Sequence, residues 1–245
     1  MGILDKIEIP RRVCPIIFML DTSMSMEGER IGAVNSAMEE LLPELITMNR
    51  ENPDAEIQIA IMSFGFEVQW VTGNSGLVTP KYVWRDLDAD GDTSLGKAFQ
   101  ELNRILSVED GFMGSTTGSV APVLFLFSDG VPTDDYIPAL AALKKNEWYK
   151  VAARVAIGYG ESSDDILREF TENSDTVLHT QNPRELKKMI RFVALTSSKV
   201  ASSGMAVSSS THISENDFDD TTNEVATALK NDDFEINFDD PDEAW

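Results

Sequence analysis

The sequence has little of several features that define large classes of proteins. It contains one cysteine, Cys14, so no internal disulfide can form, and its two histidines, His179 and His212, are the only candidates for histidine catalysis. No apolar run reaches the roughly 18 residues that a membrane-spanning helix needs, and the N-terminus shows no signal-peptide hydrophobic region. These absences favour a cytoplasmic protein.

Basic residues are also scarce. The chain has 20 Lys and Arg against 42 Asp and Glu, a formal net charge of −22, and it offers no basic patch for a phosphate backbone. We therefore expect neither nucleic acid nor an anionic membrane as a partner. Residues 198–245 hold 12 acidic and 2 basic residues among many Ser and Thr. We expect a lead-in over residues 1–11, one domain over 12–197, and an acidic tail over 198–245.

What the sequence does contain is an alternation of short apolar runs with helical patterns. The runs VCPIIFML (13–20), APVLFLF (121–127) and VAARVAI (151–157) are typical of strands buried on both faces. EIQIAIMSF and VQWVT, separated by a very short turn, indicate a hairpin. This pattern predicts an α/β fold with a Rossmann-like doubly wound, mostly parallel sheet and one antiparallel edge strand. Pro43 falls inside a helical pattern and is expected to kink or divide that helix.

Small oxygen-bearing residues follow the predicted buried strands. Asp21, Ser23 and Ser25 come after the first, Asp129 comes after APVLFLF, and Thr93 lies between them before a helix. Each element by itself is an ordinary N-cap or turn. Because an open α/β sheet binds ligands at the carboxyl ends of its strands, the three together indicate a site for a hard cation such as Mg²⁺.

The pattern Asp21-x-Ser23-x-Ser25, then Thr93, then Asp129 resembles the metal-ion-dependent adhesion site (MIDAS) of the von Willebrand factor A (VWA) family. The resemblance implies that Ser23 and Ser25 bind the metal directly, Thr93 directly or through water, and Asp21 and Asp129 largely through water. It also implies that an open metal position accepts an Asp or Glu carboxylate from a partner protein. Mg²⁺ is the expected metal, Mn²⁺ an alternative and Ca²⁺ a poorer candidate.

A narrower resemblance rests on the stretch IPRRVCPIIFMLDTSMSMEGERIGAVNSAMEELLPEL (9–45) together with SFG (63–65). It is similar to the cytosolic tellurium-resistance-associated (TerY-type) VWA proteins of bacteria. That likeness implies a scaffold in a stress-response or phospho-signalling module, with a protein kinase and a metal-dependent phosphatase as possible partners.

The stretch WRDLDADGDTSLGK (84–97) offers another metal interpretation. Asp86, Asp88 and Asp90, followed by Gly91, imitate the start of a calcium-binding EF-hand loop. Position 12 of that loop is Lys97, where a bidentate glutamate is required. We therefore interpret the stretch as a solvated acidic turn that delivers Thr93, with Asp92 available to the metal's outer shell.

Other functions stay open at this level. The Ser/Thr cluster from Ser208 to Thr222 makes the chain a candidate phosphorylation substrate with a mainly structural metal site. A tail carboxylate is a further candidate for the open metal position. A metal-dependent hydrolase is the third alternative, but the sequence shows no nucleophile paired with a base and no Gly-rich phosphate loop. We therefore expect a binding module and no enzyme.

Overall fold

The computed structural model describes residues 11–53, 55–73, 77–107, 109, 111, 113, 120–160, 162, 164–203 and 220–231. Within these residues the strands are β1 (Arg12–Asp21), β2 (Ala55–Phe64), β3 (Val68–Trp70), β4 (Val123–Ser128), β5 (Ala153–Tyr159) and β6 (Val177–Thr180). The helices are α1 (Glu29–Glu51), α2 (Leu95–Ile105), α3 (Ile137–Leu143), α4 (Glu147–Val151), α5 (Asp164–Thr171), α6 (Pro183–Ser203) and α7 (Asp220–Asn231), with 3-10 turns η1 (Met24–Met26) and η2 (Ser174–Thr176).

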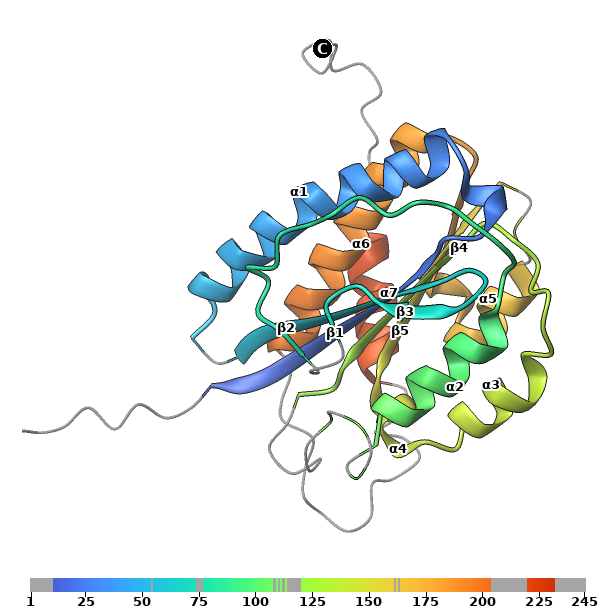
Figure 1. The fold of residues 1–245 in the computed structure, drawn as a ribbon. Helices are drawn as coiled ribbons and strands as arrows, with labels where there is room; N and C mark the ends of the chain where they lie inside the picture. Colours follow the sequence, from blue (N-terminus) through green and yellow to red (C-terminus); the bar gives the residue numbers. More distant parts are fainter. Residues whose placement is uncertain are drawn as a thin grey trace, which may run out of the picture.

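The six described strands form one sheet in the order β3-β2-β1-β4-β5-β6 (Figure 1). All neighbours pair in parallel except β2 and β3, which form the antiparallel hairpin at one edge. The predicted α/β fold with one antiparallel edge strand is therefore confirmed. The chain leaves β1 toward β2 and β3 and then returns to β4 on the other side of β1. The carboxyl ends of β1 and β4 thus mark the point where the strand order reverses, which is where such sheets bind ligands.

Helices cover both faces of the sheet, which explains why its strands are apolar throughout. Along β1, Ile16, Phe18 and Leu20 pack with residues of α1, α6 and α7. The alternate residues Ile17 and Met19 pack with residues of α2, α3, α4 and α5 on the opposite face. Because successive side chains of a strand point to opposite faces, one continuous apolar run fills two cores.

Two residues noted in the sequence differ in burial: Cys14 lies in the core and Pro43 lies on the exposed side of α1. Cys14 is fully buried, and burial raises the pKa of its thiol to about 12, so the thiol stays protonated and unreactive at neutral pH. Pro43 lies inside α1, which runs unbroken from Glu29 to Glu51, so the proline does not divide the helix. Pro43 is exposed while Leu41, Leu42 and Leu45 around it are buried, and this packing holds the helix together across the missing hydrogen bond.

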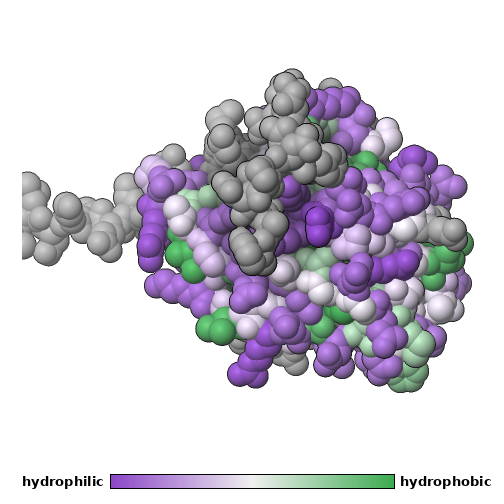
Figure 2. Space-filling model, turned by 90° about the horizontal axis from the view of Figure 1, so that it is seen from above, coloured by the Kyte–Doolittle hydropathy of each residue, from purple (hydrophilic) through white to green (hydrophobic). Residues whose placement is uncertain are grey.

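Figure 2 shows one face of the molecule on which hydrophilic residues predominate and hydrophobic residues form small, separate groups. None of the described helices combines the length and the apolar character needed to cross a bilayer.

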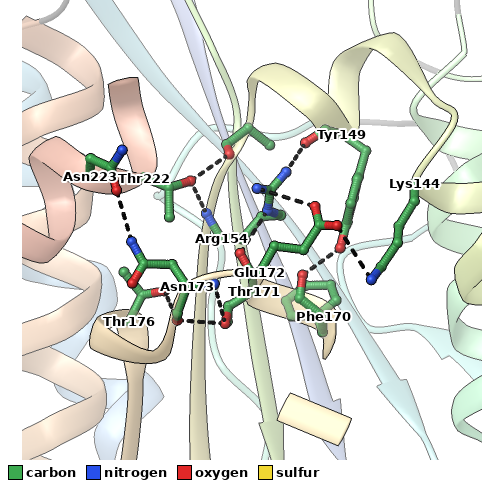
Figure 3. Close-up of polar contacts among 11 residues, drawn as sticks. Lys144, Tyr149, Arg154, Phe170, Thr171, Glu172, Asn173, Thr176, Thr222 and Asn223 are labelled. Carbon is green, nitrogen blue, oxygen red and sulfur yellow. Dashed lines mark hydrogen bonds and ion pairs between the residues drawn. The ribbon is translucent and has the colours of Figure 1, made fainter. Parts of the chain in front are cut away.

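Helix α7 packs against α6, β5 and η2. Val225 of α7 is fully buried. The Thr222 hydroxyl donates to the carbonyl of Ala152 (3.1 Å) and accepts from the backbone N–H of Arg154 (3.4 Å; Figure 3). Strand β6 pairs with β5 only from Ala156 onward. Thr222 therefore provides hydrogen-bond partners for backbone groups that precede this pairing. Of the Ser208–Thr222 cluster, residues 208–219 lie outside the described residues.

Arg154 lies near the start of β5, and its side chain connects this strand to α4 and α5. Its side chain is 6% exposed, and its guanidinium donates to the carbonyls of Thr171 (3.1 Å) and Tyr149 (2.9 Å). The Glu172 carboxylate lies 3.5 Å from the Arg154 guanidinium and also forms an ion pair with Lys144 (Figure 3). A buried guanidinium is tolerated only when it is paired and hydrogen-bonded, as here.

Replacing Thr222 with valine should destabilise the protein by about 1–3 kcal/mol, because the isosteric side chain leaves the Ala152 carbonyl and the Arg154 N–H without that partner. Urea unfolding followed by circular dichroism measures the difference. Thr227→Val is the matched control: Thr227 is exposed on the same helix and bonds only within it, so its effect should stay within about 0.5 kcal/mol. Equal effects from both variants would contradict a structural role for the Thr222 hydroxyl.

Candidate metal centre

The loop after β1 carries three of the predicted site residues and is held tightly against the core. Asp21 ends the strand, and its Oδ1 accepts the backbone N–H of Ser23 (2.9 Å), which turns the chain. Met26 in η1 is fully buried and anchors the loop. Gly28 precedes α1 as its N-cap, with φ of 85°, a left-handed conformation that glycine adopts without strain. These contacts hold the loop in place at the carboxyl end of β1.

The register of the sheet brings the loop after β4 to the same place. Leu20 is level with Phe127 in the β1–β4 ladder, so the residues that follow each strand are neighbours. The Ser23 and Ser25 hydroxyls lie 3.0 Å apart, and the Ser25 hydroxyl donates to Oδ1 of Asp129 (2.7 Å). Ser23 and Asp129 are buried while Ser25 is exposed. The structure thus brings these three oxygen-bearing side chains together, with solvent on the Ser25 side.

Thr93 joins this group from the segment before α2. Its side chain is buried, and its carbonyl accepts the backbone N–H of Thr133 (3.0 Å), which ties it to the loop after β4. A Cβ at Gly130 would lie 3.1 Å from the Thr93 hydroxyl and 3.6 Å from the Ser25 hydroxyl. Both hydroxyls therefore flank Gly130, and a larger residue there would enter the space between them.

Asp21 contributes its carboxyl group to the site from the protein interior. It is fully buried, and its Oδ2 accepts the hydroxyl of Ser128 at 2.6 Å. Burial raises the pKa of the Asp21 carboxyl to about 6, although the hydrogen bonds from Ser128 and Ser23 pull it in the opposite direction. A carboxylate held in this way is ionised at neutral pH at a cost in stability. A nearby cation would offset that cost.

Arg30 is a member of the site that the sequence reasoning missed. Its guanidinium donates to Oδ2 of Asp129 (2.5 Å) and to the carbonyl of Ser25 (3.1 Å), and it stacks 5.0 Å from the centre of the Tyr159 ring. The sequence did hold a signal. A basic residue in the first turn of a helix is unfavourable beside the positive end of the helix dipole. Its presence there indicates that Arg30 has an anionic partner outside α1. Ser128 was likewise not counted among the site residues.

The donor set fits a hard cation. Three hydroxyls and two carboxylates, all oxygen ligands, suit Mg²⁺ or Mn²⁺, and the hydroxyls are needed because the described residues contain no cluster of three His, Cys, Asp or Glu side chains. The same finding speaks against a calcium site at Asp86, Asp88 and Asp90, which are exposed along an extended segment. Asp92 is exposed as well, with no hydrogen bond or ion pair to its side chain among the described residues.

Comparison with known proteins identifies the family of the chain. Residues 16–192 match the von Willebrand factor type A domain, and this span contains all five predicted site residues. The chain belongs to the von Willebrand factor type A domain family. No curated protein sequence matches the chain.

Solved VWA structures share the fold at low sequence identity. The vWF domain of the pilus tip protein Mfa5 from Porphyromonas gingivalis aligns with a TM-score of 0.60 at 11% identity, covering 81% of this chain and 99% of that one. A von Willebrand factor type A protein from Catenulispora acidiphila gives 0.55 at 17%, covering 76% and 42%. Proximal thread matrix protein 1 from the mussel byssus, described with a zinc-occupied MIDAS motif, gives 0.56 at 18%, covering 74% and 47%.

The chain thus spans less than half the length of the last two structures. VWA domains typically act as protein-interaction modules through a divalent metal at the MIDAS, and they are generally not enzymes.

Proposed function

We propose that this VWA domain binds a partner protein by accepting its Asp or Glu carboxylate at a Mg²⁺ ion. The observation that carries the proposal is the hydrogen-bonded chain Ser23–Ser25–Asp129 at the reversal point of the sheet, with Ser25 open to solvent. Mn²⁺ is the alternative metal.

Each residue has a distinct part in that proposal. Ser23, Ser25 and Thr93 would hold the metal through their hydroxyls, with Asp21 and Asp129 acting largely through water. When bound, the metal supplies a positive charge and an open coordination position. Neutral hydroxyl ligands leave most of that charge available to a carboxylate. The buried Asp21 and Asp129 provide the negative charge that retains the ion.

The partner class is a further part of the proposal. The sequence likeness over residues 9–45 to the tellurium-resistance-associated group supports a bacterial, cytoplasmic scaffold that works with a protein kinase and a metal-dependent phosphatase. The single, buried Cys14 is compatible with a reducing compartment.

The double substitution Ser23→Ala, Ser25→Ala tests the site. We expect a loss of Mg²⁺ or Mn²⁺ affinity of about 100-fold or more by isothermal titration calorimetry, because two directly bound oxygens are removed while the fold persists. Thr47→Ala is the control, since it removes an exposed hydroxyl of α1 that bonds only within its helix. Unchanged metal affinity in the double variant would contradict the proposal.

The partner is then sought by affinity capture from native cytosol, with Mg²⁺ and with EDTA, followed by mass spectrometry. We expect proteins that the parent captures only with Mg²⁺ and that the double variant does not capture. Identical capture under all conditions would show that the metal does not mediate binding.

A further inference from the structure

A cavity of about 440 Å³ lies beside the loop that follows β1, residues 21–28, which we call the metal loop. The β2–β3 hairpin and the segment 86–90 form its other walls. Thr22, which stands between Asp21 and Ser23, lines it. Its carbonyl accepts the backbone N–H of Asp90 (2.8 Å), and the Met24 N–H donates to the carbonyl of Gly91 (2.9 Å). The segment that walls the cavity is therefore fastened to the metal loop itself, and the two sites are immediate neighbours.

The cavity is strongly acidic. Glu67, Asp86, Asp88 and Asp90 line it, and none of the described lining residues is Lys, Arg or His. The three aspartates are exposed, alternate with the half-buried Leu87 and Ala89, and line the same cavity. None of their side chains makes an ion pair or hydrogen bond within the described residues, whereas Glu67 has an exposed pair with Lys97. Carboxylates gathered around one cavity create a negative potential that attracts a cation.

Two buried hydroxyl residues provide independent support for a ligand. Thr22 and Ser63 line the cavity although each is more than nine-tenths buried. Neither hydroxyl forms a hydrogen bond to any residue that the structure describes. Because both residues line the cavity without a hydroxyl partner in the described part of the chain, these two hydroxyls can accept N–H groups from a bound molecule.

The shape of the cavity favours an organic cation over a metal ion. Among the described residues no three carboxylates converge as metal ligands. An ammonium or guanidinium group on a long stem can reach separated carboxylates. Phe66, whose side chain is 63% exposed, and the half-buried Leu87 supply apolar surface for that stem.

From these observations we infer that the cavity binds a Lys or Arg side chain of the protein whose carboxylate reaches the metal. The inference rests on the proposed function for the carboxylate half of the contact. The partner therefore carries an acidic and a basic residue close together. The metal binds the acidic residue, and the adjacent acidic cavity binds the basic one. This arrangement fixes the direction in which the partner segment lies.

Labelled peptides test this inference. Each contains one Glu and one Lys, separated by one to six neutral residues, and is compared with the same peptide carrying Gln in place of Lys. With Mg²⁺ present, fluorescence anisotropy should show a preference for Lys of about tenfold at one or more spacings. The triple variant Asp86→Asn, Asp88→Asn, Asp90→Asn should lose that preference and keep binding the Gln peptides. Glu51→Gln, Glu169→Gln, Glu224→Gln changes the net charge equally, away from the cavity, and should retain it.

The outcomes separate the two proposals. Mg²⁺-dependent binding with equal affinity for Lys and Gln peptides, or a preference that survives in the triple variant, overturns the cavity inference and leaves the proposed function intact. If no peptide binds in a Mg²⁺-dependent way, the proposed function fails. The cavity is then judged by a peptide with Lys and no Glu: amide chemical-shift changes at Thr22, Ser63 and Asp88 support it, and unmoved signals overturn it.

Discussion

Replacing Asp21 with asparagine should make the metal-free protein more stable at neutral pH and weaken metal binding about 10- to 100-fold. Asp21 is fully buried, and its pKa is raised from 3.8 to about 6, chiefly by burial. A carboxyl whose pKa is raised by folding binds its proton more tightly in the folded state. Its charge therefore destabilises the fold as the pH rises from about 3.8 to 6, by at most about 3 kcal/mol above that window. Asparagine removes the charge and can still accept the Ser23 N–H.

Urea unfolding of parent and Asp21→Asn in EDTA measures this effect. The variant should be more stable above pH 6, and the difference should shrink as the pH falls toward 4. With excess Mg²⁺ the order should reverse, because only the parent gains stability from binding. Asp92→Asn is the control, since Asp92 is exposed beside the site and its removal should change stability little. A parent more stable than the variant at pH 8 in EDTA would refute the argument from burial.

Replacing Arg30 with methionine should tighten Mg²⁺ or Mn²⁺ binding by about tenfold. The Arg30 guanidinium contacts Asp129 at 2.5 Å, so a bound divalent cation lies within a few ångströms of a like charge and competes with it for that carboxylate. Even in a high dielectric, removing such a repulsion is worth about 1–2 kcal/mol. The same variant leaves Asp129 buried without its ion pair, so the metal-free protein should be less stable than the parent.

Calorimetric titration with Mn²⁺ and urea unfolding in EDTA test these two opposite effects. Arg184→Met is the matched control, because Arg184 is an exposed arginine in the first turn of α6 and lies far along the chain from the metal loop. It should change neither quantity appreciably. Weaker metal binding in Arg30→Met would mean that Arg30 chiefly orients Asp129 for the metal and that its charge is secondary.

Much of the fold was predictable because its signals are local. The run VCPIIFML is apolar at every position, and a strand with such a pattern must be covered on both faces. The short interval between EIQIAIMSF and VQWVT likewise predicted the β2–β3 hairpin. The helix is not divided at Pro43, which was one of the two outcomes predicted for the proline. Burial of the leucines around it outweighs one missing backbone hydrogen bond, and no local pattern reports that balance.

The candidate site divides in the same way. Asp21, Ser23 and Ser25 are close in sequence, and their spacing by itself indicated a loop that presents oxygens. The roles of Ser128 and Arg30 depend on partners 107 and 99 residues away. Those contacts exist only because β1 and β4 pair in one particular register.

The sequence by itself determined which segments are strands, which oxygen-bearing residues follow them, and how acidic the molecule is. Only the tertiary structure decided that Arg30 pairs with Asp129 and that Thr22 and Ser63 line an acidic cavity. It also decided that α7 packs at the N-terminal end of β5. The physical reason is the range of the interactions. Periodicity and turn chemistry act over a few residues, whereas these contacts join elements that only the strand order and the packing of the helices bring together.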